Sequence, residues 1–389
     1  MDVLEAYRLD QRARADQAFG EDDGAWIQLA LLLAHAASSS GEVRVAQLRA
    51  ASELGRSLLG DDVWRRGYRT DPEPPADVTS LSGRIRSIAE TMEEVGALQL
   101  SDTLLEAFVA ADGAATTLER ARVEIVRARL AWKADRFDVA AERYRRAVRT
   151  ARQEQSVELR VRILIGRSVM TKHLGNYPRS RLYAGKGARL AERAGLRKLA
   201  AVGYHSLMVG AAVALGLEAA IVHGWRAYEL ADGDTVLETE VLGNMGQVFL
   251  DAGHPVVAIS AFRVVIQRSP SARILLPARG GLAIAAARLG LRHIVHEQED
   301  AVTRNAETSA TSYDMAYALL DLARARQTLG DSRTAEGHRF RSLEIASRFG
   351  FHELVHHTSA SFDVAAPVMR ELPSRLEAVA VAVQELVHA

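Results

Sequence analysis

The segment FHELVHH, at residues 351–357, contains side chains whose types and spacing are typical of a catalytic zinc site. His352 and His356 are four residues apart, so on a helix both imidazoles would point the same way and could bind one metal ion. Glu353 would then act as general base on a metal-bound water. The motif on its own therefore predicts a zinc-dependent hydrolase.

The sequence does not complete this zinc site. The extended form of the motif, HExxHxxGxxH, fails because the residues after His356 read HTSASFD. A carboxylate further along remains open as a third ligand, with Glu371 and Glu377 as candidates, but both lie near prolines in a region that we expect to cap the fold. The zinc hydrolase is therefore kept as an alternative.

Glu353 has a second explanation, because residues suited to a helix start recur at intervals of 37 to 40 before it. Five of the seven positions are acidic: Glu119, Glu158, Lys198, Glu238, Pro277, Asp314 and Glu353. A carboxylate in the first turn is favoured by the helix dipole and can cap free backbone N–H groups, and proline is tolerated there. We expect these residues to begin the first helix of successive helical hairpins, which gives Glu353 a structural role without catalysis.

The composition is that of an ordinary soluble chain. It has 389 residues, 48% hydrophobic and 25% charged, enough for several domains or a repeat array. The absence of cysteine excludes disulfides, thiolate metal sites and a cysteine nucleophile. Residues 1–17 lack the apolar core of a signal peptide, and the most apolar window, residues 26–37, is too short to span a bilayer. The absence of cysteine suits a cytoplasmic protein, and we expect no cofactor. Only four of the 49 basic residues are lysines, which is typical of a GC-rich bacterial genome.

Helical periodicity fills the chain, and no alternating pattern long enough for a strand appears. One position recurs at intervals of 36 to 41 residues and is small in all cases but one: Ser101, Ala140, Ser180, Ala220, Ala258, Ile294 and Ala335. A period near 40 in an all-helical chain predicts a solenoid of helical hairpins. The small residue lets the two helices of a hairpin approach closely, and each hairpin must stack on a neighbour to bury its remaining apolar face.

These repeats resemble the tetratricopeptide repeat (TPR) family. The matching residues are Ala128, Phe137, Ala140, Tyr144 and Ala147 in one repeat, and Gly246, Phe249, Ala258, Phe262 and Pro270 in another. The units exceed the common length of about 34 residues and are similar to the long repeats of bacterial signalling regulators, such as the sensor domain of the maltose-regulon activator. Arg127 and Arg167 depart from the pattern, because they stand where leucine is usual. The resemblance covers residues 80–360 and implies an all-α, right-handed superhelix of about seven antiparallel hairpins whose concave face binds peptides or partner proteins.

Three regions are expected along the chain. Residues 1–78 form an N-terminal helical cap or divergent repeats, and the turn-rich segment 70–80 separates them from the TPR-like array at residues 79–360. Residues 361–389 form C-terminal capping helices. The amphipathic segment 373–389 starts with Pro-Ser, a typical helix start, and we expect it to cover the apolar face of the last repeat.

One fifth of the chain is strongly basic. Residues 118–198 hold 22 Lys and Arg against 8 Asp and Glu, whereas both flanks are acidic. The first helices of two repeats carry six of these cations: Arg122, Arg129, Lys133, Arg162, Arg167 and Lys172. Because the planar fork of arginine suits carboxylates and phosphates, we expect them to bind an acidic peptide or protein. A solvated face and self-association with the acidic ends of another copy stay open. Nucleic acid is a further alternative, although interleaved aromatics and a recognition motif are lacking.

Asn244, in the segment GNMGQ, is the remaining candidate. The TPR resemblance implies an inward asparagine that holds a peptide backbone at this position, and an ordinary polar helix residue is the other interpretation. We predict a non-enzymatic scaffold or adaptor that binds a partner protein. The alternatives are a zinc hydrolase using His352, Glu353 and His356, and a module that binds nucleic acid or a transcription regulator.

Overall fold

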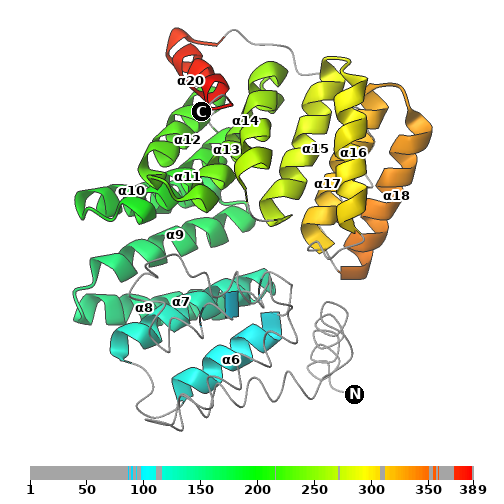
Figure 1. Cartoon of the computed structure of the whole chain (residues 1–389). Helices are drawn as coiled ribbons and strands as arrows, with labels where there is room; N and C mark the ends of the chain where they lie inside the picture. The colour runs from blue at the N-terminus through cyan, green and yellow to red at the C-terminus, as the bar shows by residue number, and fades with distance from the viewer. Residues whose placement is uncertain are drawn as a thin grey trace, which may run out of the picture. The chain divides into compact units, whose positions relative to one another are not determined.

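Every regular element in the described part of the chain is an α-helix (Figure 1). The computed structural model describes residues 86, 89–90, 93, 98–110, 116–214, 216–269, 272–306, 312–349, 354–355, 358 and 372–387. The helices are α6 (Leu98–Ala110), α7 (Thr117–Lys133), α8 (Phe137–Gln153), α9 (Val157–His173), α10 (Tyr177–Arg193), α11 (Arg197–Ala214), α12 (Leu217–Ala231), α13 (Thr235–Asp251), α14 (Pro255–Arg268), α15 (Ala272–Arg288), α16 (Arg292–Ala306), α17 (Ser312–Thr328), α18 (Ser332–Phe349) and α20 (Ser374–Glu385). None of these helices is long and apolar enough to cross a membrane. The expected all-α fold is confirmed.

The helices pair as hairpins, and each hairpin has a first and a second helix. The pairs α7 with α8, α11 with α12, α13 with α14, α15 with α16 and α17 with α18 all pack closely. The chain divides into two compact units, residues 1–166 and 167–389. Within the second unit, the first helices α11, α13, α15 and α17 contact one another in that order. This stacking of hairpins is the predicted solenoid, and the row of first helices is one surface of the second unit.

The recurring small residue lies where the second helix of each hairpin meets the first. It is the fourth residue of its helix, and Ala140, Ala220 and Ala258 have an exposed fraction of 0%. The assignment of Ile294 is wrong by one residue: α16 begins at Arg292, so its fourth residue is Val295. A β-branched side chain at this position explains why the small-residue pattern failed there.

Helix starts follow the expected acidic pattern in part. Thr116 and Glu119 form a capping box at α7, in which each side chain bonds the backbone N–H of the other. The carboxylate of Glu238 accepts a hydrogen bond from a backbone N–H in the turn before α13. Pro277 is a correction: α15 begins at Ala272, which places the proline inside the helix and not in its first turn. Glu353 lies outside the described residues.

The turns between helices need a residue with left-handed backbone geometry. Gly175 fills this position between α9 and α10 with φ of 72°, a conformation that glycine adopts without a steric cost. Asp135 occupies the same position between α7 and α8 with φ of 56°. Aspartate tolerates this conformation better than most residues, which is why the turn keeps its geometry without a glycine.

The ring of Phe262 on α14 lies between two glycines of neighbouring first helices in the second unit. A Cβ atom on Gly246 of α13 would lie 2.9 Å from the ring, and one on Gly281 of α15 would lie 2.4 Å from it. Neither distance is possible for a real side chain. The absence of a Cβ at both positions therefore lets α13 and α15 press against the same aromatic ring.

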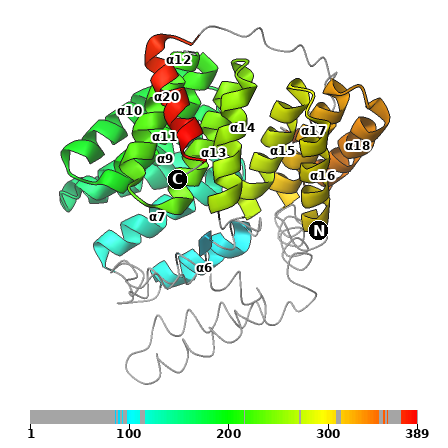
Figure 2. The ribbon, with the colours of Figure 1, turned by 45° about the horizontal axis from the view of Figure 1, so that its top comes forward.

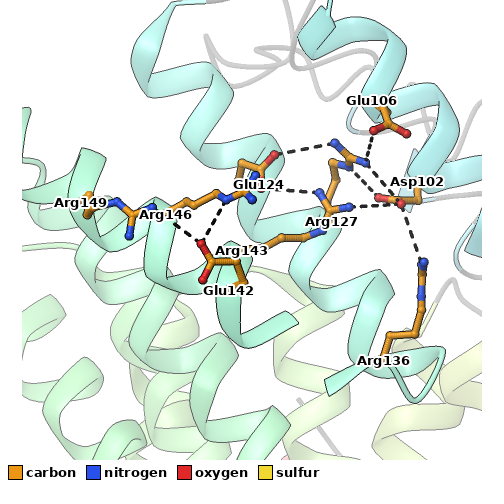
Figure 3. Close-up of polar contacts among 9 residues, drawn as sticks. All are labelled: Asp102, Glu106, Glu124, Arg127, Arg136, Glu142, Arg143, Arg146 and Arg149. Atoms are coloured by element: carbon orange, nitrogen blue, oxygen red, sulfur yellow. Dashed lines mark hydrogen bonds and ion pairs between the residues drawn. The ribbon is translucent and has the colours of Figure 1, made fainter. Parts of the chain in front are cut away.

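An ion-pair network holds α6, α7 and α8 together in the first unit (Figure 3). Arg127 has an exposed fraction of only 5%, and its Nε lies 2.7 Å from Oδ1 of Asp102. Arg143 and Glu124 also belong to the network, with Arg143 3.5 Å from Asp102 and 3.6 Å from Glu124. Burial alone would lower the pKa of Arg127, but its bond to Asp102 outweighs this and raises the pKa. An arginine can occupy this position, where leucine is usual in the repeat, because Asp102 on α6 pairs with it.

The C-terminal helix α20 does not cover the last repeat. It packs against α12 and α14, and Nη2 of Arg268 donates a hydrogen bond of 3.1 Å to the carbonyl of Leu386 (Figure 2). Leu376, Ala380 and Val383 form its buried stripe. The sequence identified a helix with one face to bury, but an apolar stripe does not reveal which surface receives it. The regions expected at residues 1–78 and the boundary at residue 361 lie outside the described residues.

Replacement of Gly281 by alanine tests the packing of Phe262. We expect Gly281→Ala to lower the free energy of unfolding by about 1–3 kcal/mol, because the added methyl must displace the ring or the helix. Urea unfolding followed by circular dichroism measures the change. Gly337→Ala in α18 is the matched control: nothing lies within 4 Å of its added Cβ, so a gain of up to about 1 kcal/mol is expected. Equal stability of the two variants would contradict the proposed packing.

Replacement of Arg127 by methionine tests the ion-pair network. We expect Arg127→Met to lower the free energy of unfolding by roughly 3 kcal/mol, because the buried side chain of Asp102 loses its main ion-pair partner. Arg149→Met on α8 should change stability by less than about 0.5 kcal/mol, since its side chain is 63% exposed. A loss of similar size in both variants would mean that burial of Arg127 carries no special cost.

Candidate functional site

The predicted basic residues of the first unit lie in ion pairs with carboxylates of the same chain. Arg122 and Arg162 both contact Glu158, at 2.8 and 2.7 Å. Arg129 and Lys133 both contact Glu93, at 2.8 and 2.6 Å. An acidic partner that binds these cations therefore has to compete with carboxylates already in place.

The contacts with Arg129 and Lys133 lower the pKa of Glu93. Burial alone would raise the pKa of Glu93, but the positive charges of Arg129 and Lys133 outweigh it and hold the pKa below the ordinary value. Arg167 and Lys172, the other two predicted cations, fall in the second unit, and both are partly buried. The structure thus brings four of the six basic residues into two clusters, each centred on a glutamate.

A pocket of about 250 Å³ opens on the row of first helices in the second unit, and we call it the inner pocket. It is lined by Glu240, Gly243, Asn244 and Gln247 of α13, Phe262 of α14, Arg273, Ile274, Pro277 and Ala278 of α15, and Tyr313, Asp314 and Tyr317 of α17. Asn244 is therefore the predicted site residue that lines a cavity. The ring of Phe262, which spaces α13 and α15, also lines it.

The hydrogen bonds of Asn244 fix which way its amide points. Nδ2 lies 3.0 Å from the backbone carbonyl of Glu240, which only accepts, so this atom must be the nitrogen. Nδ2 also lies 3.0 Å from Nε2 of His205 on α11. The imidazole nitrogen must then be the acceptor, which requires a neutral ring. Burial lowers the pKa of His205, in agreement with a neutral imidazole at pH 7. Among the described residues, Oδ1 of Asn244 accepts no hydrogen bond.

The pocket lining also contains a second amide, a proline and one cationic side chain. Nε2 of Gln247 donates to Oδ1 of Asp251 at 2.7 Å, which leaves the amide oxygen of Gln247 to accept. Pro277 has no N–H, so it donates no hydrogen bond to the carbonyl of Arg273. Arg273 is the one cationic side chain of the pocket lining, and it pairs with Glu240 at 3.6 Å.

A buried carboxylate lies one helical turn beyond Tyr317. Asp321 has an exposed fraction of 1%, and Arg324 pairs with its Oδ1 at 3.0 Å. Its Oδ2 is buried without a hydrogen-bond partner among the described residues. Burial raises the pKa of Asp321 to about 6, although the charge of Arg324 opposes this. The negative charge of Asp321 and then burial raise the pKa of Tyr317, whose hydroxyl stays protonated.

The zinc-site residues His352, Glu353 and His356 lie outside the described residues, as does Glu371. Within the described ranges, no cluster of three or more His, Asp or Glu side chains could hold a metal ion. Glu377 lies in the first turn of α20. The zinc motif therefore stays a prediction.

Sequence reasoning found one residue of the inner pocket and missed its neighbours. Gln247 is three residues after Asn244, and Glu240 is four before it, so all three share a helix face. Tyr313 and Tyr317 are likewise four apart on α17. This spacing was a usable signal on each helix, but the meeting of α13, α15 and α17 at one cavity depends on packing that the sequence does not display.

The fold is similar to that of a solved repeat protein. No family model matches the chain, and no curated protein matches it. A solved STAND protein (signal transduction ATPase with numerous domains) from Pyrococcus horikoshii, which carries a tetratricopeptide repeat sensor, aligns with 84% of this chain at a TM-score of 0.52 and 10% sequence identity. The chain covers 50% of that protein's length. This likeness supports a TPR-like helical repeat fold and says nothing of the activity.

Replacement of Asp321 by asparagine tests the cost of the buried carboxylate. Its folded pKa of about 6 lies above an unfolded value of about 3.9, so the native state binds the proton more tightly. The contribution of Asp321 to the free energy of unfolding therefore falls by up to about 3 kcal/mol as the pH rises from about 4 to 6. We expect Asp321→Asn to be more stable than the native chain at pH 7.5 by up to that amount.

The same comparison at pH 4.5, where the native carboxyl is largely protonated, should show little of this gain. Urea unfolding at both pH values measures the difference. A stability change that is the same at pH 7.5 and pH 4.5 would show that Asp321 does not titrate in this range.

Proposed function

We propose that the protein is a non-enzymatic interaction module that captures an extended segment of a partner protein at the inner pocket. The observation that carries the proposal is Asn244, whose free acceptor lines a cavity on the row of first helices in a TPR-like repeat. An acceptor held by two fixed hydrogen bonds is ready to bind a backbone N–H without reorganisation. A largely preformed site of this kind lowers the ordering cost of binding.

The role fits an adaptor or the sensor arm of a signalling protein in the bacterial cytoplasm. The likeness to a protein with a tetratricopeptide repeat sensor supports the idea of a sensor. In such a role the chain contributes binding without a catalytic step.

An acidic partner, expected from the basic residues, is a further part of the proposal for the first unit. Such a partner would replace Glu93 at Arg129 and Lys133, or Glu158 at Arg122 and Arg162. Glutamates that already hold the cations make this exchange costly, which gives the inner pocket the stronger support as the primary site.

Affinity purification from the native host tests the proposal, with proteins quantified by mass spectrometry. We expect at least one co-purified protein to fall about tenfold in Asn244→Ala, because loss of a buried hydrogen bond weakens binding by roughly 1.4 kcal/mol. Gln267→Ala is the matched control: it removes an exposed amide from the second helix α14 and should retain the partner.

Circular dichroism of each variant confirms that the fold is kept. Identical partner sets for the native chain, Asn244→Ala and Gln267→Ala would contradict binding at the inner pocket. Loss of the partner in Gln267→Ala alone would place binding on the second helices.

A further inference from the structure

We propose that the inner pocket binds the cationic side chain of an arginine or lysine in the partner segment. This inference rests on the proposed function and names the chemistry of the residue that enters the pocket. It follows from three properties of the lining: its hydrogen-bond acceptors, its aromatic walls and its charge.

The lining carries hydrogen-bond acceptors, so it suits a ligand that carries donors. Oδ1 of Asn244 and Oε1 of Gln247 are acceptors, because the nitrogen of each amide is already used inside the protein. A guanidinium or ammonium group carries only donors, so it can satisfy both of these acceptors at once. A carboxylate, which only accepts, would leave them without partners.

Aromatic rings form much of the remaining wall. Tyr313 has an exposed fraction of 39%, and Tyr317 and Phe262 line the same cavity. The face of an aromatic ring attracts a cation within about 6 Å, and a tyrosine hydroxyl can also accept a hydrogen bond. Aliphatic carbons of a long arginine or lysine side chain pack on the same rings.

The charges around the pocket favour a cation. Glu240 and Asp314 oppose the single positive charge of Arg273, which Glu240 already offsets at 3.6 Å. His205, which supports Asn244 from α11, is neutral because it accepts the hydrogen bond described above. An incoming cation therefore meets a lining with a net negative charge.

The size of the cavity points to one side chain and not to a larger molecule. Pockets for drug-sized ligands usually hold about 300–1,000 Å³, and the inner pocket holds about 250 Å³. One long side chain fits this volume, while the rest of the partner segment runs along the helices outside it. The neighbouring acceptors then bind the N–H groups of the segment.

Selection from a random 12-residue peptide library on phage tests this inference on the full chain. We expect the selected peptides to share an arginine or lysine, and their binding to weaken about tenfold in Glu240→Gln. Glu218→Gln removes an exposed carboxylate from α12, outside the pocket, and should leave binding unchanged. A synthetic copy of one selected peptide, with its arginine replaced by the neutral isostere citrulline, should also bind about tenfold more weakly to the native chain.

Each other result overturns the inference. Selected peptides without a shared basic residue, or a citrulline peptide that binds as well as the arginine peptide, contradict it directly. Basic peptides whose affinity is equal in the native chain, Glu240→Gln and Asn244→Ala bind elsewhere and contradict it too. An acidic or neutral consensus that is lost in Asn244→Ala overturns this inference but keeps the proposed function. Failure to select any consensus contradicts both.

Discussion

The ring of Phe262 lies between two glycines and sets how closely two first helices of the second unit approach. Gly246 and Gly281 belong to consecutive first helices, and a Cβ on either would collide with the ring. The absence of both side chains lets α13 and α15 close on one aromatic group contributed by α14. The same ring lines the inner pocket. The distance between the first helices and the shape of the cavity therefore have one physical origin.

Much of the fold could be predicted because helices that approach closely require small residues at regular positions in the sequence. The small residues Ala140, Ala220 and Ala258 recur because they lie where second helices press on first helices, and all are fully buried. The small-residue pattern failed in α16, whose fourth residue is Val295. The separate helix-start pattern failed at Pro277, because α15 begins earlier than the period suggests. Helix starts depend on capping partners in the turn, which periodicity does not record. The sequence also does not predict the surface against which α20 packs, since an apolar stripe does not specify which helices it contacts.

The candidate site was harder to predict because a sequence shows charges without their neighbours. Residues 118–198 carry a large positive excess, yet Arg129 and Lys133 share Glu93, which lies outside that segment. Arg127 is likewise buried against Asp102, which also lies outside that segment. The sequence does not predict the inner pocket, because each helix contributes only a few of its residues and these meet only when the helices pack. Asn244 was found through the resemblance to TPR proteins.

We propose that the acceptors and aromatic rings on the first helices let the inner pocket hold a segment of another protein. The direct test is a crystal structure of the chain bound to a selected peptide. The account predicts an extended peptide across α13, α15 and α17, with a backbone N–H that donates to Oδ1 of Asn244 and a basic side chain between Tyr313 and Tyr317. A peptide bound on the second helices α12, α14 and α16, with the inner pocket empty, would contradict it.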